Sequence, residues 1–197
     1  MADAAPDRVS ALAPAGAPAI WRGDGLAIEE RTGLGHIVFR GRREATVLDA
    51  AARVLNFALP SAGAVAEATG IAALGIADDE WLLVVAAERE GDLVDALAEA
   101  TAGRHAALVT VGHGTVTIRV SGPRARDCLA KGASLDLHVR AFGPGRCAAT
   151  GFGRVRVILH QVDASPVFDL HVNRSFALGF WGWLSDAALE WSGTGGA

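Results

Sequence analysis

Short apolar runs and helical patterns alternate in the first half of the chain. Apolar residues recur at spacings of three and four from Val47 to Ala58 and from Leu93 to Ala100, which predicts two helices that each bury one face. Strands are predicted at the four apolar runs 36–39, 71–76, 81–85 and 106–111. The resulting order, β-α-β-β-α-β, is that of a ferredoxin-like unit, in which two helices cover one face of a sheet.

A second unit begins after residue 114. Alternating Val116, Ile118 and Val120 predict a half-buried strand over 115–120. A helix is expected to start at Ser121-Gly122-Pro123, and we expect Gly132 to end it in the left-handed conformation.

The rest of this unit contains three further strands and a last helix. The strands are predicted over 147–151, 155–160 and 167–172. Asn173 is a suitable N-cap for a helix to about residue 190, with Phe176, Phe180, Trp183, Leu184 and Ala187 on its apolar face.

The two units share the order strand, glycine, helix, which indicates an internal duplication. We therefore predict an α+β fold of two fused ferredoxin-like lobes, with antiparallel sheets covered by helices and Gly112-His113-Gly114 as the hinge. The predicted divisions are an extended N-terminal arm over 1–32, a first lobe over 33–111, a second lobe over 115–191 and a flexible tail over 192–197.

Proline interrupts the alanine-rich start of the arm. Pro6, Pro14 and Pro18 leave segments that are too short for stable isolated helices. Residues 1 to about 20 are expected to lack regular secondary structure and to pack on a partner or on the lobe surface. Asp3 and Asp7 also argue against a signal peptide.

Composition narrows the class of protein. The 197 residues are 51% hydrophobic and 20% charged, which is typical of a folded chain, and the net charge of -4 provides no overall attraction to nucleic acid or anionic membranes. The longest apolar run, 81–87, is far shorter than the roughly 20 residues of a membrane-spanning helix. Two cysteines fit a reducing compartment, so we expect a cytoplasmic protein.

The charges are unevenly distributed along the chain. Residues 119–156 contain eight basic and two acidic side chains, a net of +6, whereas the remainder has a net of -10. This basic stretch could face an anionic cofactor or an acidic partner, or could consist of ordinary exposed arginines.

Catalytic and cofactor motifs are not found. The Gly-x-Gly pairs at 33, 112 and 151 lack the third glycine of a dinucleotide-binding loop, and the six histidines do not have the spacing of metal ligands. Cys128 lies on an apolar helical stripe and is better explained as core than as a nucleophile, and Cys147 is more ambiguous. We therefore predict no catalytic, cofactor-binding or metal-ligating residue in this chain.

One tryptophan points to a contact surface. Trp181 and Trp183 lie about 200° apart around a helix, so both indoles are not expected to face one core. Trp181 is predicted either to contact a partner or to be covered by the N-terminal arm of this chain.

The sequence over 119–142 closely resembles the gamma subunit of heterotetrameric sarcosine oxidase. The resemblance is carried by the Ser121-Gly122-Pro123 helix start, the Lys131-Gly132 stop and the Leu135-Asp136-Leu137-His138 segment, in that order. Residues 79–84 also match, and the resemblance extends from about 33 to 190.

This resemblance implies a non-catalytic gamma subunit of an αβγδ flavoenzyme that oxidatively demethylates sarcosine or a related N-methyl amino acid. The one-carbon unit would pass to tetrahydrofolate or leave as formaldehyde. FAD and FMN are implied in the beta subunit, NAD and a folate site in the alpha subunit and zinc in the delta subunit. The implied fold is a fragment of the T-protein aminomethyltransferase fold, without the C-terminal barrel of that enzyme.

Two other functions remain open at this point. One is a stand-alone folate-binding, aminomethyltransferase-like protein, and the other is a generic interaction module.

The main contact with the alpha subunit is predicted over 134–142. This segment follows a helix stop and mixes apolar anchors with polar groups, as interfaces do. The interface residues predicted here, together with Trp181, are Leu135, Leu137, His138, Arg140 and Phe142. The alternative is that Leu135 and Leu137 fold back onto their own helix.

Overall fold

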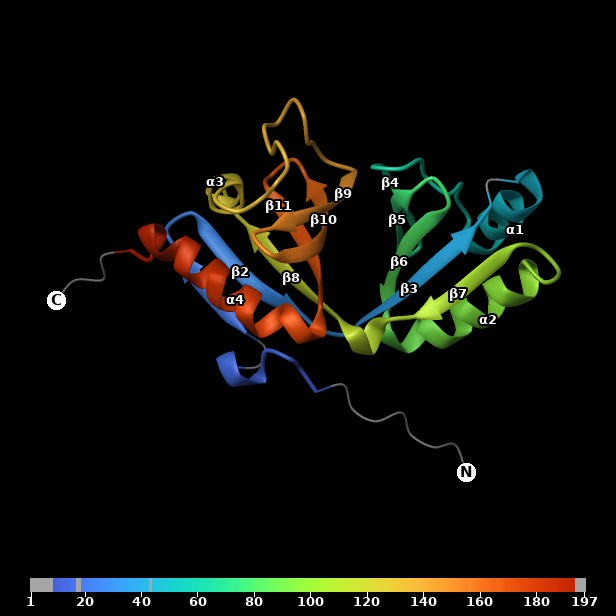
Figure 1. Cartoon of the computed structure of the whole chain (residues 1–197), viewed down its shortest axis with the longest axis horizontal. Coiled ribbons are helices and arrows are strands. Elements are labelled where there is room, and N and C mark those ends of the chain that lie inside the picture. The colour runs from blue at the N-terminus through green and yellow to red at the C-terminus, as the bar shows by residue number, and fades with distance from the viewer. Residues whose placement is uncertain (1–8, 17–18, 43, 194–197) are drawn as a thin grey trace.

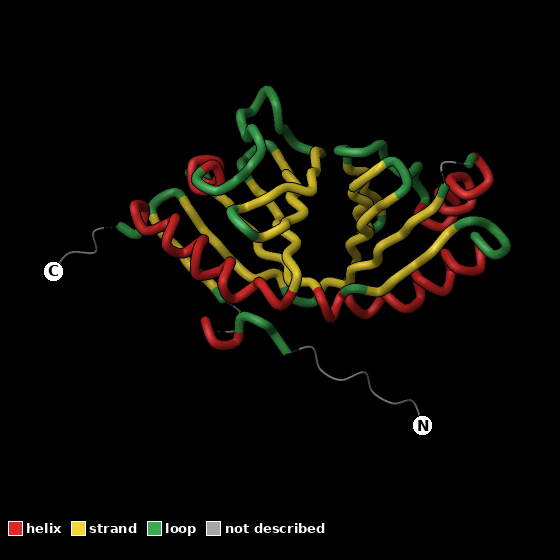
Figure 2. Tube along the Cα trace, in the orientation of Figure 1, coloured by secondary structure: helices red, strands yellow, loops and turns green. Residues whose placement is uncertain are grey.

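The computed structural model describes residues 9–16, 19–42 and 44–193, which form two lobes side by side (Figure 1). Each lobe contains one antiparallel sheet, and its helices lie mainly on the face turned away from the other lobe (Figure 2). The layers therefore run helix, sheet, sheet, helix. This arrangement confirms the predicted α+β class.

The first lobe has the predicted β-α-β-β-α-β order with one added strand. Its elements are β3 (Leu34–Gly41), α1 (Ala45–Leu55), β4 (Val65–Ala68), β5 (Ile71–Ala77), β6 (Glu80–Ala86), α2 (Glu90–Ala100) and β7 (Ala106–Thr110). The sheet order is β4-β5-β6-β3-β7. Phe39 and Trp81 lie at the centre of its core with no exposed surface, because alternate residues of β3 and β6 face the two helices.

The second lobe is built on a sheet of six strands. Its elements after the hinge are β8 (Thr115–Ser121), α3 (Ala125–Ala130), β9 (Arg146–Phe152), β10 (Val155–Asp163), β11 (Val167–Asn173) and α4 (Arg174–Ala188). The sheet order is β1-β2-β8-β11-β10-β9. Asn173 caps α4 as predicted, because its side-chain oxygen accepts a hydrogen bond from the Ser175 amide.

The two remaining strands correct the predicted N-terminal arm. Residues 20–31 form the hairpin β1 (Ile20–Gly23) and β2 (Leu26–Arg31), and β2 pairs with β8. Leu26 and Ile28 alternate into the core, and Asp24-Gly25 supplies a two-residue turn in which Gly25 has a φ of 69°. Both signals are present in the sequence and predict a hairpin, so an extended arm over 1–32 was the wrong interpretation of this segment.

The segment before this hairpin packs on its own lobe. Leu12 has no exposed surface and belongs to the core of the second lobe, and a short 3-10 helix spans Ala13–Ala15. Ser10 donates a 2.6 Å hydrogen bond to the carboxylate of Glu30 on β2. Residues 1–8 and 17–18 of the predicted arm and 194–197 of the predicted tail lie outside the described residues.

The hairpin also gives the second sheet the strand arrangement around β8 that the first sheet has around β3. In the first sheet, β7 is the final strand of the unit and pairs with β3. In the second sheet, no strand follows α4 in the described part of the chain, and β2 occupies the equivalent position beside β8. The N-terminal strand thus completes the second ferredoxin-like unit. The Gly112–Gly114 turn joins the two units, where we expected the hinge.

Gly132 lies just beyond α3, which ends at Ala130 with Lys131 as its C-cap, and is not the helix stop that we predicted. Its φ is not positive, so the residue is not a left-handed stop. A Cβ at Gly132 would lie 2.4 Å from the Trp183 ring, so glycine permits α3 and α4 to approach closely.

Candidate functional site

The two sheets meet along a seam that is apolar at one end and polar at the other. At the apolar end, Leu74 and Leu82 of the first lobe pack near Cys147 of the second. Two backbone hydrogen bonds also join the lobes there, from the Cys147 amide to the Gly63 carbonyl (3.1 Å) and from the Val65 amide to the Gly145 carbonyl (2.9 Å). The lobes are therefore fixed together by both packing and backbone pairing.

At the polar end, the buried side chains of His36, Thr117 and His171 join the two lobes. The Thr117 hydroxyl oxygen lies 2.9 Å from Nε2 of His36 and 2.9 Å from Nδ1 of His171. His36 comes from β3, whereas Thr117 and His171 are cross-strand partners on β8 and β11. Because one hydroxyl has a single proton to donate, at least one of the two rings donates to the Thr117 oxygen.

Burial keeps His171 neutral. Loss of hydration, together with smaller contributions from the nearby His160 and Arg119, lowers its pKa to about 3. Burial also lowers the pKa of His160, partly opposed by the charge of Asp169. Asp169 in turn receives two 2.7 Å hydrogen bonds from the Arg119 guanidinium. Neutral imidazoles thus lie near an ion pair, Arg119–Asp169, in which both carboxylate oxygens already accept a hydrogen bond.

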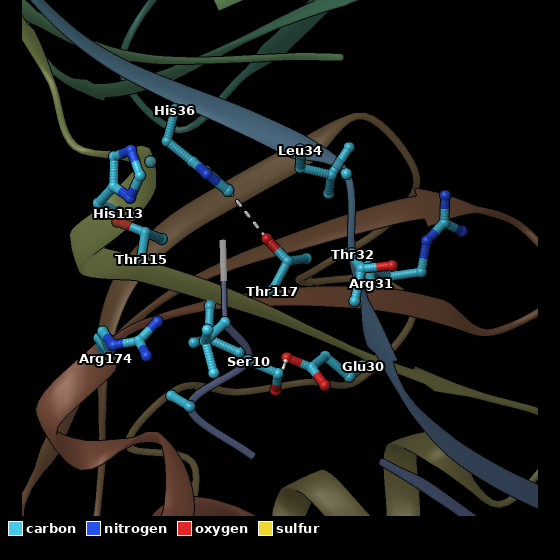
Figure 3. A pocket seen from close by; sticks show the side chains of 15 residues that line it. Ser10, Glu30, Arg31, Thr32, Leu34, His36, His113, Thr115, Thr117 and Arg174 are labelled. Carbon is cyan, nitrogen blue, oxygen red and sulfur yellow. Dashed lines mark hydrogen bonds between the residues drawn. The ribbon is translucent and has the colours of Figure 1, made fainter. Parts of the chain in front are cut away.

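Two cavities open on either side of this histidine cluster. One of about 390 Å³ is lined by His36 and Thr117, by the Ser10 and Glu30 pair and by Arg174 (Figure 3). Figure 3 shows the His36 side chain extending toward Thr117. The other, of about 590 Å³, lies between the lobes and is lined by residues that include His171 and Arg156.

The predicted interface segment over 134–142 is partly buried in this chain. Leu137 and Phe142 are 5% and 3% exposed and belong to the core of the second lobe. The Arg126 guanidinium holds the second half of the segment in place, because it donates to the backbone carbonyls of Leu137 and Phe142. Leu137 and Phe142 therefore do not extend from the surface as the predicted anchors.

The middle of this segment remains accessible. His138, Val139 and Arg140 are exposed, and Leu135 is half-buried against the core. The Arg140 amide donates to the His138 ring, which holds the turn in a compact shape. The residues here that could contact a partner are thus His138 and Arg140 of the predicted set, with Val139 in addition.

Trp181 is covered by its own lobe. It is 7% exposed and belongs to the core, and Trp183 is half-buried with its ring stacked on Phe180 at 6.0 Å. The expectation that both indoles do not face one core was wrong, because Trp183 packs against the same core through Phe152 and the end of α3 at Gly132. Phe176 is instead 54% exposed and lines the larger cavity.

Both cysteines are buried thiols. Burial raises the pKa of Cys128 and of Cys147 to about 11, so neither is a thiolate at neutral pH. Cys147 also donates to the carbonyls of Ala64 and Gly75 across the seam.

The described residues were also searched for metal and membrane sites. No three of their His, Cys, Asp or Glu side chains come close enough together to hold a metal ion. None of the helices in these ranges combines the length and the apolar character that membrane crossing requires.

The histidine cluster and the larger cavity were not predicted from the sequence. Thr117 and His171 occupy the polar positions of alternating strands, which is a signal that they share a sheet face. Nothing in their spacing indicates that His36, 81 residues before Thr117, lies against the same face.

Comparisons with known proteins agree on one family. The family model described as "Sarcosine oxidase, gamma subunit family" matches residues 41–190. Sarcosine oxidase subunit gamma from Arthrobacter sp is 36% identical over 112 residues, which cover 56% of this chain and 54% of that protein. The match thus spans about half the length of this curated relative.

Two solved structures share the fold. A chain of the heterotetrameric sarcosine oxidase from Corynebacterium sp. U-96, in complex with pyrrole 2-carboxylate, is 25% identical with a TM-score of 0.85, covering 96% of this chain and 99% of that one. Glycine cleavage system aminomethyltransferase T from Bartonella henselae is 12% identical with a TM-score of 0.61, covering 82% of this chain and 46% of that one. The second likeness concerns the fold alone and agrees with the expected T-protein-like lobes.

Proposed function

Because the chain belongs to the sarcosine oxidase gamma subunit family, we propose that it is the gamma subunit of a heterotetrameric flavoenzyme that oxidises sarcosine or a related N-methyl amino acid. The observation that carries the proposal is the match of nearly the whole chain to a chain of a heterotetrameric sarcosine oxidase. The partners in this proposal are the alpha, beta and delta subunits, in the cytoplasm.

The overall reaction in this proposal is an oxidative demethylation. Hydride leaves the N-methyl carbon for a flavin, and the resulting one-carbon unit passes to tetrahydrofolate or is released as formaldehyde. FAD, FMN, NAD, tetrahydrofolate and zinc belong to the partner subunits. The gamma chain contributes no catalytic residue and acts through its surfaces.

The exposed turn His138 to Arg140 is the contact that we propose for the alpha subunit. Val139 is 61% exposed and lies between an imidazole and an arginine, which is the mixture of apolar and polar groups found at interfaces. Arg126 donates to the backbone carbonyls on both sides of the turn, and it also donates a 2.7 Å hydrogen bond to Gln161 on β10. The turn is therefore held in a fixed shape before any partner binds.

Co-expression tests this function. We expect the tagged chain, produced with the proteins encoded beside its gene, to elute with larger subunits in a complex that consumes oxygen when sarcosine is added. Elution of the chain alone would contradict the proposal. Saturable binding of tetrahydrofolate by the chain alone would favour the folate-binding alternative, and a complex without flavin would favour a generic interaction module.

A further inference from the structure

Three of the four edge strands of the two sheets are covered or blunted by the chain itself. β4 and β9 lie edge to edge across the seam, where Ala64 pairs with Arg146. β1 is only four residues long and contains the charged Arg22, two features that discourage further pairing. Just after β1, the Asp24 amide donates a 2.6 Å hydrogen bond to the Trp191 carbonyl. The remaining edge strand is β7.

β7 has none of these protections. Its sequence over 106–110, Ala-Ala-Leu-Val-Thr, contains no charged residue and no proline, and its register with β3 is unbroken. Val109 is 56% exposed. A regular, uncharged and exposed edge of this kind is a template for a further strand.

The available hydrogen-bonding groups of β7 belong to alternate residues. The Val111 amide donates a 2.7 Å hydrogen bond to the His36 carbonyl, toward β3. In an antiparallel ladder, bonding alternates along the strand, so Val109 also bonds toward β3. The backbone N–H and C=O groups of Leu108 and Thr110 thus point away from β3, and no hydrogen bond to them is found within the described ranges.

The second lobe shows how the place beside such a strand is filled. β2 lies beside β8 as β7 lies beside β3, and β2 has the antiparallel strand β1 on its other side. In the part of the chain that the structure describes, no strand occupies the equivalent place beside β7. The first sheet therefore has room for one more strand at this edge.

The charges of α2 favour a basic partner at this edge. α2 packs on β7 (Figure 1), and Glu90–Ala100 contains four acidic residues and no basic one. Asp92, Asp95 and Glu99 are exposed at spacings of three and four, so they share one face of the helix. None of these three carboxylates forms an ion pair with another described residue.

The arginines near this edge are in contrast engaged by the chain itself. Arg40 and Arg42 pair with Glu80 and Glu44, and Arg104 donates to two backbone carbonyls at the end of α2 and just after it. A second copy of the chain paired through β7 would bring its own acidic α2 close to this one, which disfavours self-pairing.

We propose that the open edge of β7 receives a strand from a larger subunit, and that this strand presents lysine or arginine side chains to α2. The backbone groups of Leu108 and Thr110 form its hydrogen bonds, and one of its side chains covers Val109. This inference rests on the proposed function, because the partner is a subunit of the proposed complex.

Hydrogen exchange of the co-expressed complex tests the backbone contact. The amides of Leu108 and Thr110 gain acceptors in the complex, so we expect them to exchange at least about tenfold more slowly there than in the chain alone. Unchanged exchange of both amides in a complex that does form would overturn this inference and leave the proposed function standing. Elution of the chain alone would contradict the proposed function and, with it, this partner.

Two pairs of variants test the edge and the charge separately. Thr110→Pro removes an outward amide and should reduce elution with the larger subunits at least about fivefold, whereas Thr110→Ser keeps the amide and should stay within about twofold of the wild type. Glu99→Lys should reduce elution about threefold. Asp49→Lys makes the same charge change at an exposed position on α1 and should leave elution unchanged.

Three results with these variants would overturn the inference. These are normal assembly of Thr110→Pro, equal effects of Glu99→Lys and Asp49→Lys, and a wild-type chain that forms a dimer which Thr110→Pro abolishes, since the occupant would then be a second copy. Circular dichroism shows whether each variant is folded. If Thr110→Pro does not fold, hydrogen exchange of the wild-type complex still decides the contact.

Discussion

Burial at single positions decides which side chains of the proposed interface can meet a partner. Leu137 is 5% exposed, so an aspartate there would bury a carboxylate that has no partner. We expect Leu137→Asp to lower the free energy of unfolding by at least about 3 kcal/mol. Urea unfolding followed by tryptophan fluorescence measures this loss.

Arg140→Ala is the control for Leu137→Asp. Because Arg140 is exposed, its loss should change the free energy of unfolding by less than about 0.5 kcal/mol. In the co-expressed complex, the same variant should reduce elution with the larger subunits. A Leu137→Asp chain as stable as the wild type would place this leucine on the surface and restore it as a predicted anchor.

The N-terminal hairpin is the element that most changes the description of the fold. Ile28 on β2 has no exposed surface, whereas Ile20 on β1 is 54% exposed. We expect Ile28→Asp to cost at least about 4 kcal/mol of stability, and Ile20→Asp less than about 1 kcal/mol. Thermal unfolding of both variants by circular dichroism provides the comparison.

The two hairpin variants show whether residues 20–31 form strands of the second sheet or an extended arm. If residues 20–31 were an extended arm, neither substitution would reach the core, and both chains would unfold with the wild type. A large loss for Ile28→Asp alone would confirm that β2 completes the second sheet.

Most elements were predictable from periodicity, but the short strands were not. The helix predicted over 47–58 is found at Ala45–Leu55, and the predicted strands of the first lobe overlap β3, β5, β6 and β7. The four-residue strands β1 and β4 contain too few positions to establish alternation. The six-residue β2 does alternate, and its signal was overlooked because proline and alanine dominate the sequence before it.

The contact between the lobes makes stability depend on pH. An unfolded histidine binds a proton below about pH 6.5, whereas His171 in the folded chain has a pKa of about 3. Between these values the unfolded state binds more protons, so stability falls as pH falls from 6.5 toward 3. The lowered pKa of His160 acts in the same direction.

We expect the free energy of unfolding to decrease by about 2 kcal/mol between pH 7.5 and 5 because of His171. Urea unfolding at both values measures the change. His171→Phe should reduce this dependence, while His138→Ala, at an exposed histidine, should retain it. Equal pH dependence of the wild type and His171→Phe would contradict the assignment of a buried neutral imidazole.

The sequence alone determined the fold class, the order of most elements and the family resemblance of this chain. These follow from local periodicity, which reports which face of a strand or helix is buried, and from motifs within one stretch such as 119–142. The tertiary structure alone decided that β2 joins β8, that Leu137 and Phe142 turn inward, and that His36 meets Thr117 and His171 between the lobes. Such pairings join residues that are far apart in the chain. Local periodicity shows which face of each element is buried, but it does not specify which other element packs against that face.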